Sequence, residues 1–383
     1  MKLTTQIFKL MVLLQPLLLY ATVFKVTILV QLISDFILIG SFVQLFTVLG
    51  NRKNNTVDKT TIILAISIIV IAFLSLYTGG FSYAGLIAYL MFVSMLATWV
   101  VYPFINADEL KKVCKYSFLL QALLVVYLSR LSFAYDIVED DMVITSDMLT
   151  LGFNNPNLTS MIVFYVFVAI LMYFKDEKNF LVKIFYFILL CYLFYLIYQT
   201  DCRTTLFMLV FLIVSFFLTS RNKILSSFMK KKIITIATLA FPILFGLSYV
   251  YFSHLPEYRD IELLGKPLFS GRQTLFVDFY KTLSENPIIG LCGRYKFANA
   301  HNGMLTILLN TGFIGLILYI IYTYRNLRSL SNTIIKPNDV LYLIAIIAVY
   351  ISSSVESAMI VAGNLFYVYL MYLLVATRRN TIQ

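Results

Sequence analysis

Charged residues are scarce in this chain of 383 residues: they make up 13% of it, whereas hydrophobic residues make up 60%. Soluble domains contain about 25% charged and about 45–50% apolar residues, so this composition excludes an ordinary soluble domain. The apolar residues form successive runs of about 20 residues, the length of a helix that crosses a hydrocarbon core. Because these runs do not alternate between apolar and polar positions, they are unlike the strands of a membrane β-barrel. We therefore predict an all-α, polytopic integral membrane protein.

The sequence also lacks the motifs that bind nucleotides or catalytic zinc. It has no GxxxxGK[ST] loop, no GxGxxG following a strand and no HExxH. No pair of its four cysteines has the spacing of metal ligands. Cys202 and Cys292 both lie in predicted outer connections, which leaves a disulfide between them open. We expect no cofactor and no metal, so the energy for any reaction must arrive in the substrate.

Basic residues are concentrated between the apolar runs. We predict about twelve spans, at 7–24, 26–49, 60–77, 84–105, 116–134, 158–174, 182–199, 204–219, 233–252, 303–323, 339–355 and 358–376. The connections rich in Lys and Arg are 51–59, 106–115, 175–183, 220–232 and 324–338. Cytoplasmic connections carry such an excess, so both termini are expected in the cytoplasm. This placement accounts for the net charge of +11 without a nucleic-acid partner.

Two longer connections face outward in this topology. The first, 135–157, is acidic, and its run Glu139-Asp140-Asp141 would either hold a divalent cation or form a solvated surface. The second, 253–302, is the longest polar interruption in the chain. We treat residues 1–383 as a single transmembrane domain that includes this large extracytoplasmic loop before the tenth span.

A short amphipathic helix is predicted inside the large loop. Apolar residues between Leu275 and Leu283 recur at helical spacing, which is typical of a helix lying on a membrane surface. Ser270 is suited to cap its start. Asn286-Pro287 should end it, because proline disfavours a helical conformation in the residue before it.

Three basic side chains stand at predicted helix N-termini on the outer side. Arg203 begins a span, Arg272 begins the surface helix and His301 begins the tenth span. The helix dipole disfavours a cation at this end, so an anion is expected to occupy the site. Helix N-termini and arginine bind phosphate well, and we infer a pyrophosphate site made by Arg203, Arg272 and Arg294. The same dipole should keep His301 neutral, so that it can accept a proton as a general base.

Structural explanations for the same residues stay open. Each of the three arginines could be an interfacial anchor, and His301 could be a polar side chain satisfied within the fold. Asp35 lies inside a predicted span, where a charge is costly. It is either functional or protonated and hydrogen-bonded.

Several short motifs follow one another in a defined order. They are Asn155-Pro-Asn157 before a span, Arg203 within Asp-Cys-Arg-Thr-Thr, Gly271-Arg272 at the start of the outer helix, Pro287, Gly290 with Gly293, and His301-Asn302 at the start of a span. Together they resemble the O-antigen ligase and polymerase superfamily, the Wzy-like integral membrane proteins. One departure is Cys202, because a serine often precedes the arginine in that family. The region before Thr150 is similar only in being hydrophobic.

The resemblance implies a substrate and roles for the residues. Such proteins use undecaprenyl-diphosphate-linked glycans as donors and transfer the glycan outside the bacterial cytoplasmic membrane, without a metal and with inversion at the sugar carbon. Residues like Arg203 and Arg272 are thought to hold the pyrophosphate, and a residue like His301 to activate the acceptor. Asn302 and Asn157 are expected to support the site.

The sequence leaves three functions open. The first is a polymerase that joins repeat units of O-antigen, capsular polysaccharide or exopolysaccharide, with a flippase and a chain-length regulator as partners. The second is a ligase that moves the glycan to lipid A core or to protein; it would share the donor site. The third is a flippase or transporter, which should instead place charged residues along a cavity near the membrane midplane.

Overall fold

Helices dominate the structure, a computed structural model. It describes residues 2–50, 63, 66–67, 70, 107–131, 135–139, 142–146, 149–153, 156–253, 255–258, 261–263, 266–267, 273–290, 300–333 and 340–355. The predicted spans 84–105 and 358–376, and most of 60–77, lie outside this set.

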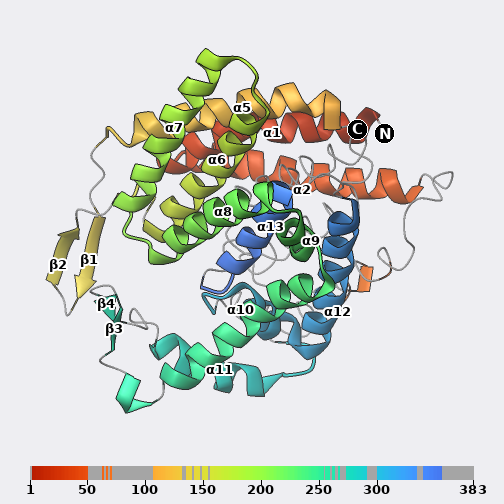
Figure 1. The fold of residues 1–383 in the computed structure, drawn as a ribbon. Coiled ribbons are helices and arrows are strands. Elements are labelled where there is room, and N and C mark those ends of the chain that lie inside the picture. The colour runs from red at the N-terminus through yellow and green to blue at the C-terminus, as the bar shows by residue number, and fades with distance from the viewer. Residues whose placement is uncertain are drawn as a thin grey trace.

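The elements follow one another along the chain as drawn in Figure 1. The helices are α1 (Lys2–Val23), α2 (Thr27–Gly50), α5 (Ala107–Leu128), α6 (Pro156–Asp176), α7 (Phe180–Gln199), α8 (Arg203–Arg221), α9 (Lys223–Met229), α10 (Lys232–Ser253), α11 (Gln273–Glu285), α12 (Gly303–Thr333) and α13 (Val340–Ser352). The 3-10 helix η2 is Pro256–Tyr258, and the strands are β1 (Tyr135–Glu139), β2 (Met142–Ser146), β3 (Glu262–Leu263) and β4 (Lys266–Pro267).

Many of these helices have the length and composition of membrane spans. Among the described residues, 6 helices are long and apolar enough to cross a membrane, namely α1, α2, α6, α7, α10 and α12. The helices α8 and α13 are apolar but shorter. The chain is therefore a helical membrane protein. A total of about twelve spans stays a prediction.

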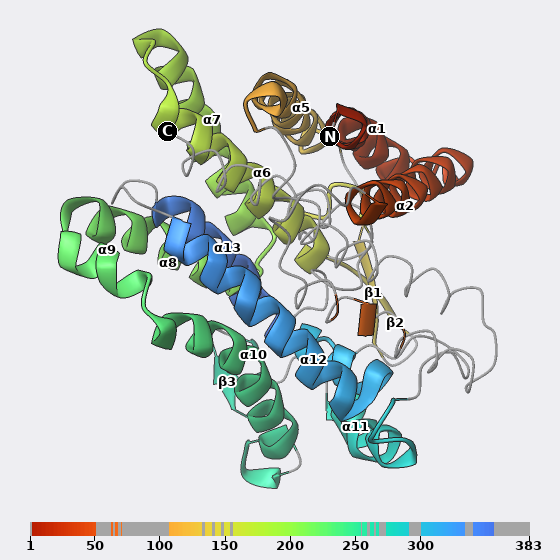
Figure 2. The same cartoon turned by 90° about the vertical axis from the view of Figure 1, so that its right-hand side faces the viewer.

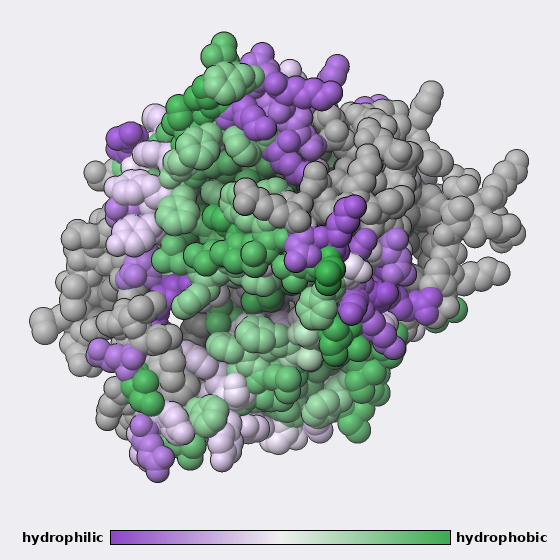
Figure 3. Space-filling view, viewed as in Figure 1, coloured by the Kyte–Doolittle hydropathy of each residue, from purple (hydrophilic) through white to green (hydrophobic). Residues whose placement is uncertain are grey.

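The core of the bundle is built around α6 and α13. Nearly all side chains of both helices are buried, which is typical of a helix that is apolar all round and enclosed by neighbours. The helix α7 instead exposes large apolar side chains such as Phe180, Leu181 and Ile188. Figure 3 shows apolar residues, in green, over much of one face. In a membrane such a surface contacts lipid chains.

A proline in α1 leaves one backbone carbonyl without its helical hydrogen bond, and a neighbouring helix supplies the missing donor. Pro16 has no N–H, so the carbonyl of Val12 loses its normal donor four residues later. The Ser117 hydroxyl of α5 donates to that carbonyl at 2.6 Å. This contact fastens α5 to α1 at the point where the helical hydrogen-bond pattern is interrupted.

The connections are arranged at two ends of the bundle. In Figure 2 the α6–α7 connection and α9 lie toward one end, whereas α11 and the β1–β2 hairpin lie toward the other. The basic connections 175–183 and 220–232 thus share an end, opposite the predicted outward connections. The side that faces the cytoplasm stays a prediction.

The first outward connection forms a hairpin that was not predicted from the sequence. Strands β1 and β2 pair antiparallel from Tyr135 with Ser146 to Glu139 with Met142. Their β-branched residues, such as Ile137, Val143 and Ile144, favour strands and were a readable signal. A second, shorter hairpin is formed by β3 and β4 in the large loop.

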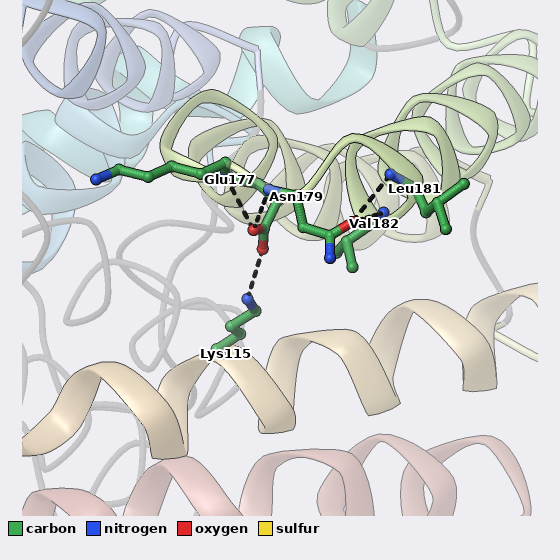
Figure 4. Close-up of polar contacts among 6 residues, drawn as sticks. Lys115, Glu177, Asn179, Leu181 and Val182 are labelled. Carbon is green, nitrogen blue, oxygen red and sulfur yellow. Dashed lines mark hydrogen bonds and ion pairs between the residues drawn. The ribbon is translucent and has the colours of Figure 1, made fainter.

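An ion pair at the opposite end joins α5 to the α6–α7 connection (Figure 4). Lys115 Nζ lies 3.0 Å from Glu177 Oε2, and the Glu177 side chain is 16% exposed. The other carboxylate oxygen accepts hydrogen bonds from the N–H groups of Lys178 at 2.9 Å and Asn179 at 3.0 Å. Asn179 caps α7, because its Oδ1 accepts from two backbone N–H groups of the first turn.

These donors favour the ionised form of Glu177. The hydrogen bond from the Asn179 N–H, followed by that from Lys115, lowers the pKa of Glu177 to about 2. A carboxyl whose pKa is lower in the folded state stabilises the fold above the pKa of the unfolded chain, about 4.3. That contribution is lost as the pH falls through about 2.

Replacing Glu177 with Gln should therefore lower the Tm of the detergent-purified protein at pH 7. The change should be at most about 2 °C, because ion pairs near the surface contribute little. The Tm difference from wild type should shrink below about pH 4 and vanish near pH 2. Glu285→Gln, at the exposed end of α11, is the control. A Tm difference that stays constant from pH 7 to pH 2 would contradict the assignment.

Candidate functional site

The N-termini of α6, α8 and α12 lie at the same end of the bundle. Near the starts of α8 and α6, Thr205 Oγ1 donates to Met161 Sδ at 3.8 Å. Further along α6, the Tyr165 side chain interacts with Ser352 at the end of α13. The next residue, Ser353, accepts a hydrogen bond from the Gly303 N–H at 2.7 Å, where α12 begins. A continuous series of contacts therefore joins the three helix starts.

Arg203 is the first residue of α8, as predicted. The preceding Cys202 has extended backbone geometry and provides no side-chain cap to the helix. Asp201, one residue earlier, has a left-handed φ of 51°. The half-buried Arg203 guanidinium thus stands at an N-terminus that already carries partial positive charge from the helix dipole. Phosphate binding by this residue stays a prediction.

His301 lies just before α12 in a constrained loop. Its φ of 47° is left-handed, a conformation uncommon outside glycine although histidine is among the residues that adopt it more often. The loop folds against the first turn of the helix, because the Ala300 N–H donates to Thr306 Oγ1 at 3.1 Å. The imidazole is half-buried at this position. The backbone therefore fixes where His301 sits relative to α12.

Asn302 connects three helices through one side chain. Its Nδ2 donates to the carbonyls of Pro242 in α10 and Ser354 after α13, both at 2.7 Å. Its Oδ1 accepts from the Leu305 N–H at 3.0 Å and so caps α12. The side chain is 2% exposed, which makes each of these bonds a buried one. We call this set of contacts the Asn302 clasp.

The clasp requires a glycine on the neighbouring helix. A Cβ at Gly246 of α10 would lie 2.6 Å from Asn302 Nδ2. A supporting role was predicted for Asn302, whereas Gly246 and Ser354 were not predicted. The run Ser352-Ser353-Ser354 at the end of an apolar span was the available signal, because clustered hydroxyl residues there indicate a polar junction.

Asn157 lies at the beginning of α6, directly after Pro156. Proline is well suited to this first helical position, where its missing N–H costs nothing. The entry to the helix is held by Thr159, whose hydroxyl donates to the carbonyl of Thr150. Asn157 is half-buried at the same end of the bundle as Arg203. Its predicted supporting role is compatible with this place but stays a prediction.

Other predicted site residues lie outside the described residues. Arg272 and Arg294 are the two that matter for the pyrophosphate site. The helix predicted after Arg272 is present as α11, which begins at Gln273 and ends at Glu285, directly before Asn286-Pro287. Its position on a membrane surface stays a prediction.

The structure adds less support for the other residues that the sequence suggested as functional. Cys202 is a free, buried cysteine, and Cys292 lies outside the described residues. Asp35 is half-buried on α2. Glu139 ends β1, whereas Asp140 and Asp141 lie outside the described residues. Within the described part of the chain, no group of three His, Cys, Asp or Glu side chains is placed to hold a metal ion.

No protein-family model matches the chain, and no curated protein matches it in sequence. The argument for function therefore rests on the residues and their placement.

Replacing Asn302 with Ala should destabilise the protein by about 2–4 kcal/mol, because two buried carbonyls and one N–H lose their partner. Asn326→Ala is the matched control: it lies in the same helix, is buried and makes one local bond, to the carbonyl of Tyr322 at 2.9 Å. Thermal unfolding of the purified variants in detergent should show a clearly larger fall in Tm for Asn302→Ala. Equal falls would show that the clasp does not join the helices.

Proposed function

We propose that this protein is a polysaccharide polymerase of the bacterial cytoplasmic membrane. It joins undecaprenyl-diphosphate-linked oligosaccharide repeat units on the outer side of that membrane. The observation that supports this proposal most is that the starts of α8 and α12, with Arg203 and His301, lie at one end of the bundle and are linked through α6 and α13. The topology that goes with it has about twelve spans, both termini in the cytoplasm and the loop 253–302 outside.

The proposed reaction is a direct displacement at the donor sugar. A hydroxyl oxygen of the acceptor repeat unit forms a bond to the anomeric carbon of the donor glycan. The bond from that carbon to the diphosphate oxygen breaks, and undecaprenyl diphosphate leaves with the electron pair. Attack from the opposite face inverts the configuration at this carbon. His301 takes the proton of the attacking hydroxyl.

The arginines stabilise the leaving group. Diphosphate gains negative charge as the bond breaks, and guanidinium groups match phosphate oxygens in two-pronged contacts. Arg203 provides one such group beside the backbone N–H groups of α8, which add the favourable end of the helix dipole. Arg272 and Arg294 are proposed to complete the diphosphate site from the large loop.

Ala replacements test this assignment in cells. Arg203→Ala should lower polymer by at least about tenfold, because a charge-assisted contact to the diphosphate is lost. His301→Ala should lower it by about 100-fold or more, since a general base contributes about 10²–10⁴. Arg272→Ala should resemble Arg203→Ala. The measurement is the glycan profile of a deletion strain that carries each variant at matched membrane abundance.

The chain offers matched controls for both residue types. His254→Ala removes the other histidine, and Arg325→Ala removes an arginine near the opposite end of α12. Both should leave polymer near normal. Single repeat units on the acceptor indicate a polymerase, whereas polymer stranded on its lipid carrier would make the protein a ligase. Near-normal product from all three site variants would reject the site.

A further inference from the structure

The helix α12 is interrupted inside its apolar part. Gly312 has φ 66° and ψ −173°, so the chain leaves helical geometry there and resumes it directly afterwards. Such a break separates backbone N–H groups from their usual acceptors four residues earlier. In hydrocarbon or in a protein core each unsatisfied group costs several kcal/mol, so the break needs a partner.

The partner is the turn that follows α11. The Phe313 N–H donates to the carbonyl of Pro287 at 2.9 Å, and the Ile314 N–H donates to that of Ile288 at 3.2 Å. The turn closes on itself, because the Gly290 N–H donates to the carbonyl of Asn286 at 2.9 Å. Residues 286–290 thus supply the acceptors that the broken helix lacks.

Two glycines make this approach sterically feasible, one on each side. A Cβ at Gly312 would lie 2.2 Å from the carbonyl oxygen of Ile288, and a Cβ at Gly290 would lie 2.4 Å from that of Asn310. Both glycines also have positive φ, 66° and 81° respectively, which side chains disfavour. The obstructing atoms are backbone atoms, which cannot rotate aside. We call this reciprocal contact the Gly290–Gly312 joint.

The joint fixes α11 against the first half of α12. Between its ends, α11 is anchored by Phe279, which is 2% exposed and packed in the core. The far end of α11 begins at Gln273, directly after Arg272 in the sequence. The first half of α12 begins two residues after His301 and is held there by the Asn302 clasp. Clasp and joint therefore hold both ends of the segment 303–311.

We infer that Gly290 and Gly312 are positioning residues, whose backbone joint holds the start of α11 at a fixed place relative to His301. This inference rests on the proposed function, in which the start of α11 belongs to the diphosphate site and His301 activates the acceptor. Transfer requires both groups at their places at once. A small displacement between them slows transfer steeply, since a misplacement of about 1 Å can cost about 100-fold.

The first experiment loosens the joint. Gly312→Ala and Gly290→Ala are compared with Gly50→Ala, a glycine at the end of α2 where an added Cβ meets nothing within 4 Å. Hydrogen–deuterium exchange of the detergent-purified full chain reports the joint itself. In both joint variants, peptides covering 286–290 and 310–316 should both exchange faster than in wild type. In Gly50→Ala the same peptides should exchange at the wild-type rate. Wild-type protection in both joint variants would overturn the joint.

The second measurement separates positioning from general stability. With purified protein and a lipid-linked repeat unit, the joint variants should lose at least about tenfold in kcat. The KM for the donor should change less than kcat does, since Arg203 lies on α8, which the joint does not hold, and keeps its proposed contact to the diphosphate. Equal kcat in the joint variants and Gly50→Ala would overturn the positioning role, even if exchange is faster.

A cross-link covers the case in which the glycine variants fail to fold. Ile288 and Phe313 are 61% and 48% exposed and lie on the two segments that the joint connects. The double variant Ile288→Cys with Phe313→Cys should form a disulfide under mild oxidation and keep its kcat, whereas the single variants should not link. Loss of kcat on linking would show that the joint opens during turnover and would overturn the proposal.

These experiments distinguish a failure of the inference from a failure of the proposed function. If wild-type protein makes no polymer and His301→Ala matches it, the proposed function fails while the exchange and cross-linking results still judge the joint. If wild type makes polymer and His301→Ala does not, the kcat of the joint variants tests the positioning role alone.

Discussion

The amide of Asn302 satisfies three buried backbone groups from three parts of the chain. It holds α10, the start of α12 and the end of α13 at one point, next to His301. An apolar bundle has few other means to fix helix ends, because lipid and core provide no hydrogen-bond partners. The clasp therefore holds together the end of the bundle at which α6, α8 and α12 begin. The candidate site lies at this end and depends on the clasp.

The same constraint explains two other irregular places in the fold, at Pro16 and Gly312. The carbonyl that Pro16 leaves without a donor is satisfied by Ser117. The N–H groups released at Gly312 are satisfied by the turn after α11. In each case an interruption of one helix becomes a contact with another segment. Both interruptions thus add hydrogen bonds between separate segments of the chain.

Local features could be predicted from the sequence. Apolar runs predicted the helices α1, α2, α6, α7, α10 and α12, because a membrane helix needs a long continuous apolar segment. Asn286-Pro287 predicted the end of α11, because proline limits the residue before it. The position of Arg203 at a helix start followed in the same way. The losses of polymer predicted for Arg203→Ala and His301→Ala depend on these local features.

Contacts between distant segments could not be predicted. The meeting of Gly290 with the backbone at Asn310 depends on how α11 packs, which no local pattern encodes. The bond from Asn302 to Ser354 spans residues far apart in the chain. The β1–β2 hairpin was missed for another reason: its acidic residues dominated the interpretation although its β-branched residues indicated strands.

The central claim is that the helix starts at one end of the bundle form a site for a diphosphate-linked isoprenoid. Native mass spectrometry of the detergent-purified protein with undecaprenyl diphosphate, undecaprenyl phosphate and undecaprenol tests it directly. The account predicts that the diphosphate binds most tightly, and that Arg203→Ala weakens this binding by about tenfold or more whereas Arg325→Ala does not. Equal binding of the three lipids, or wild-type affinity in Arg203→Ala, would contradict it.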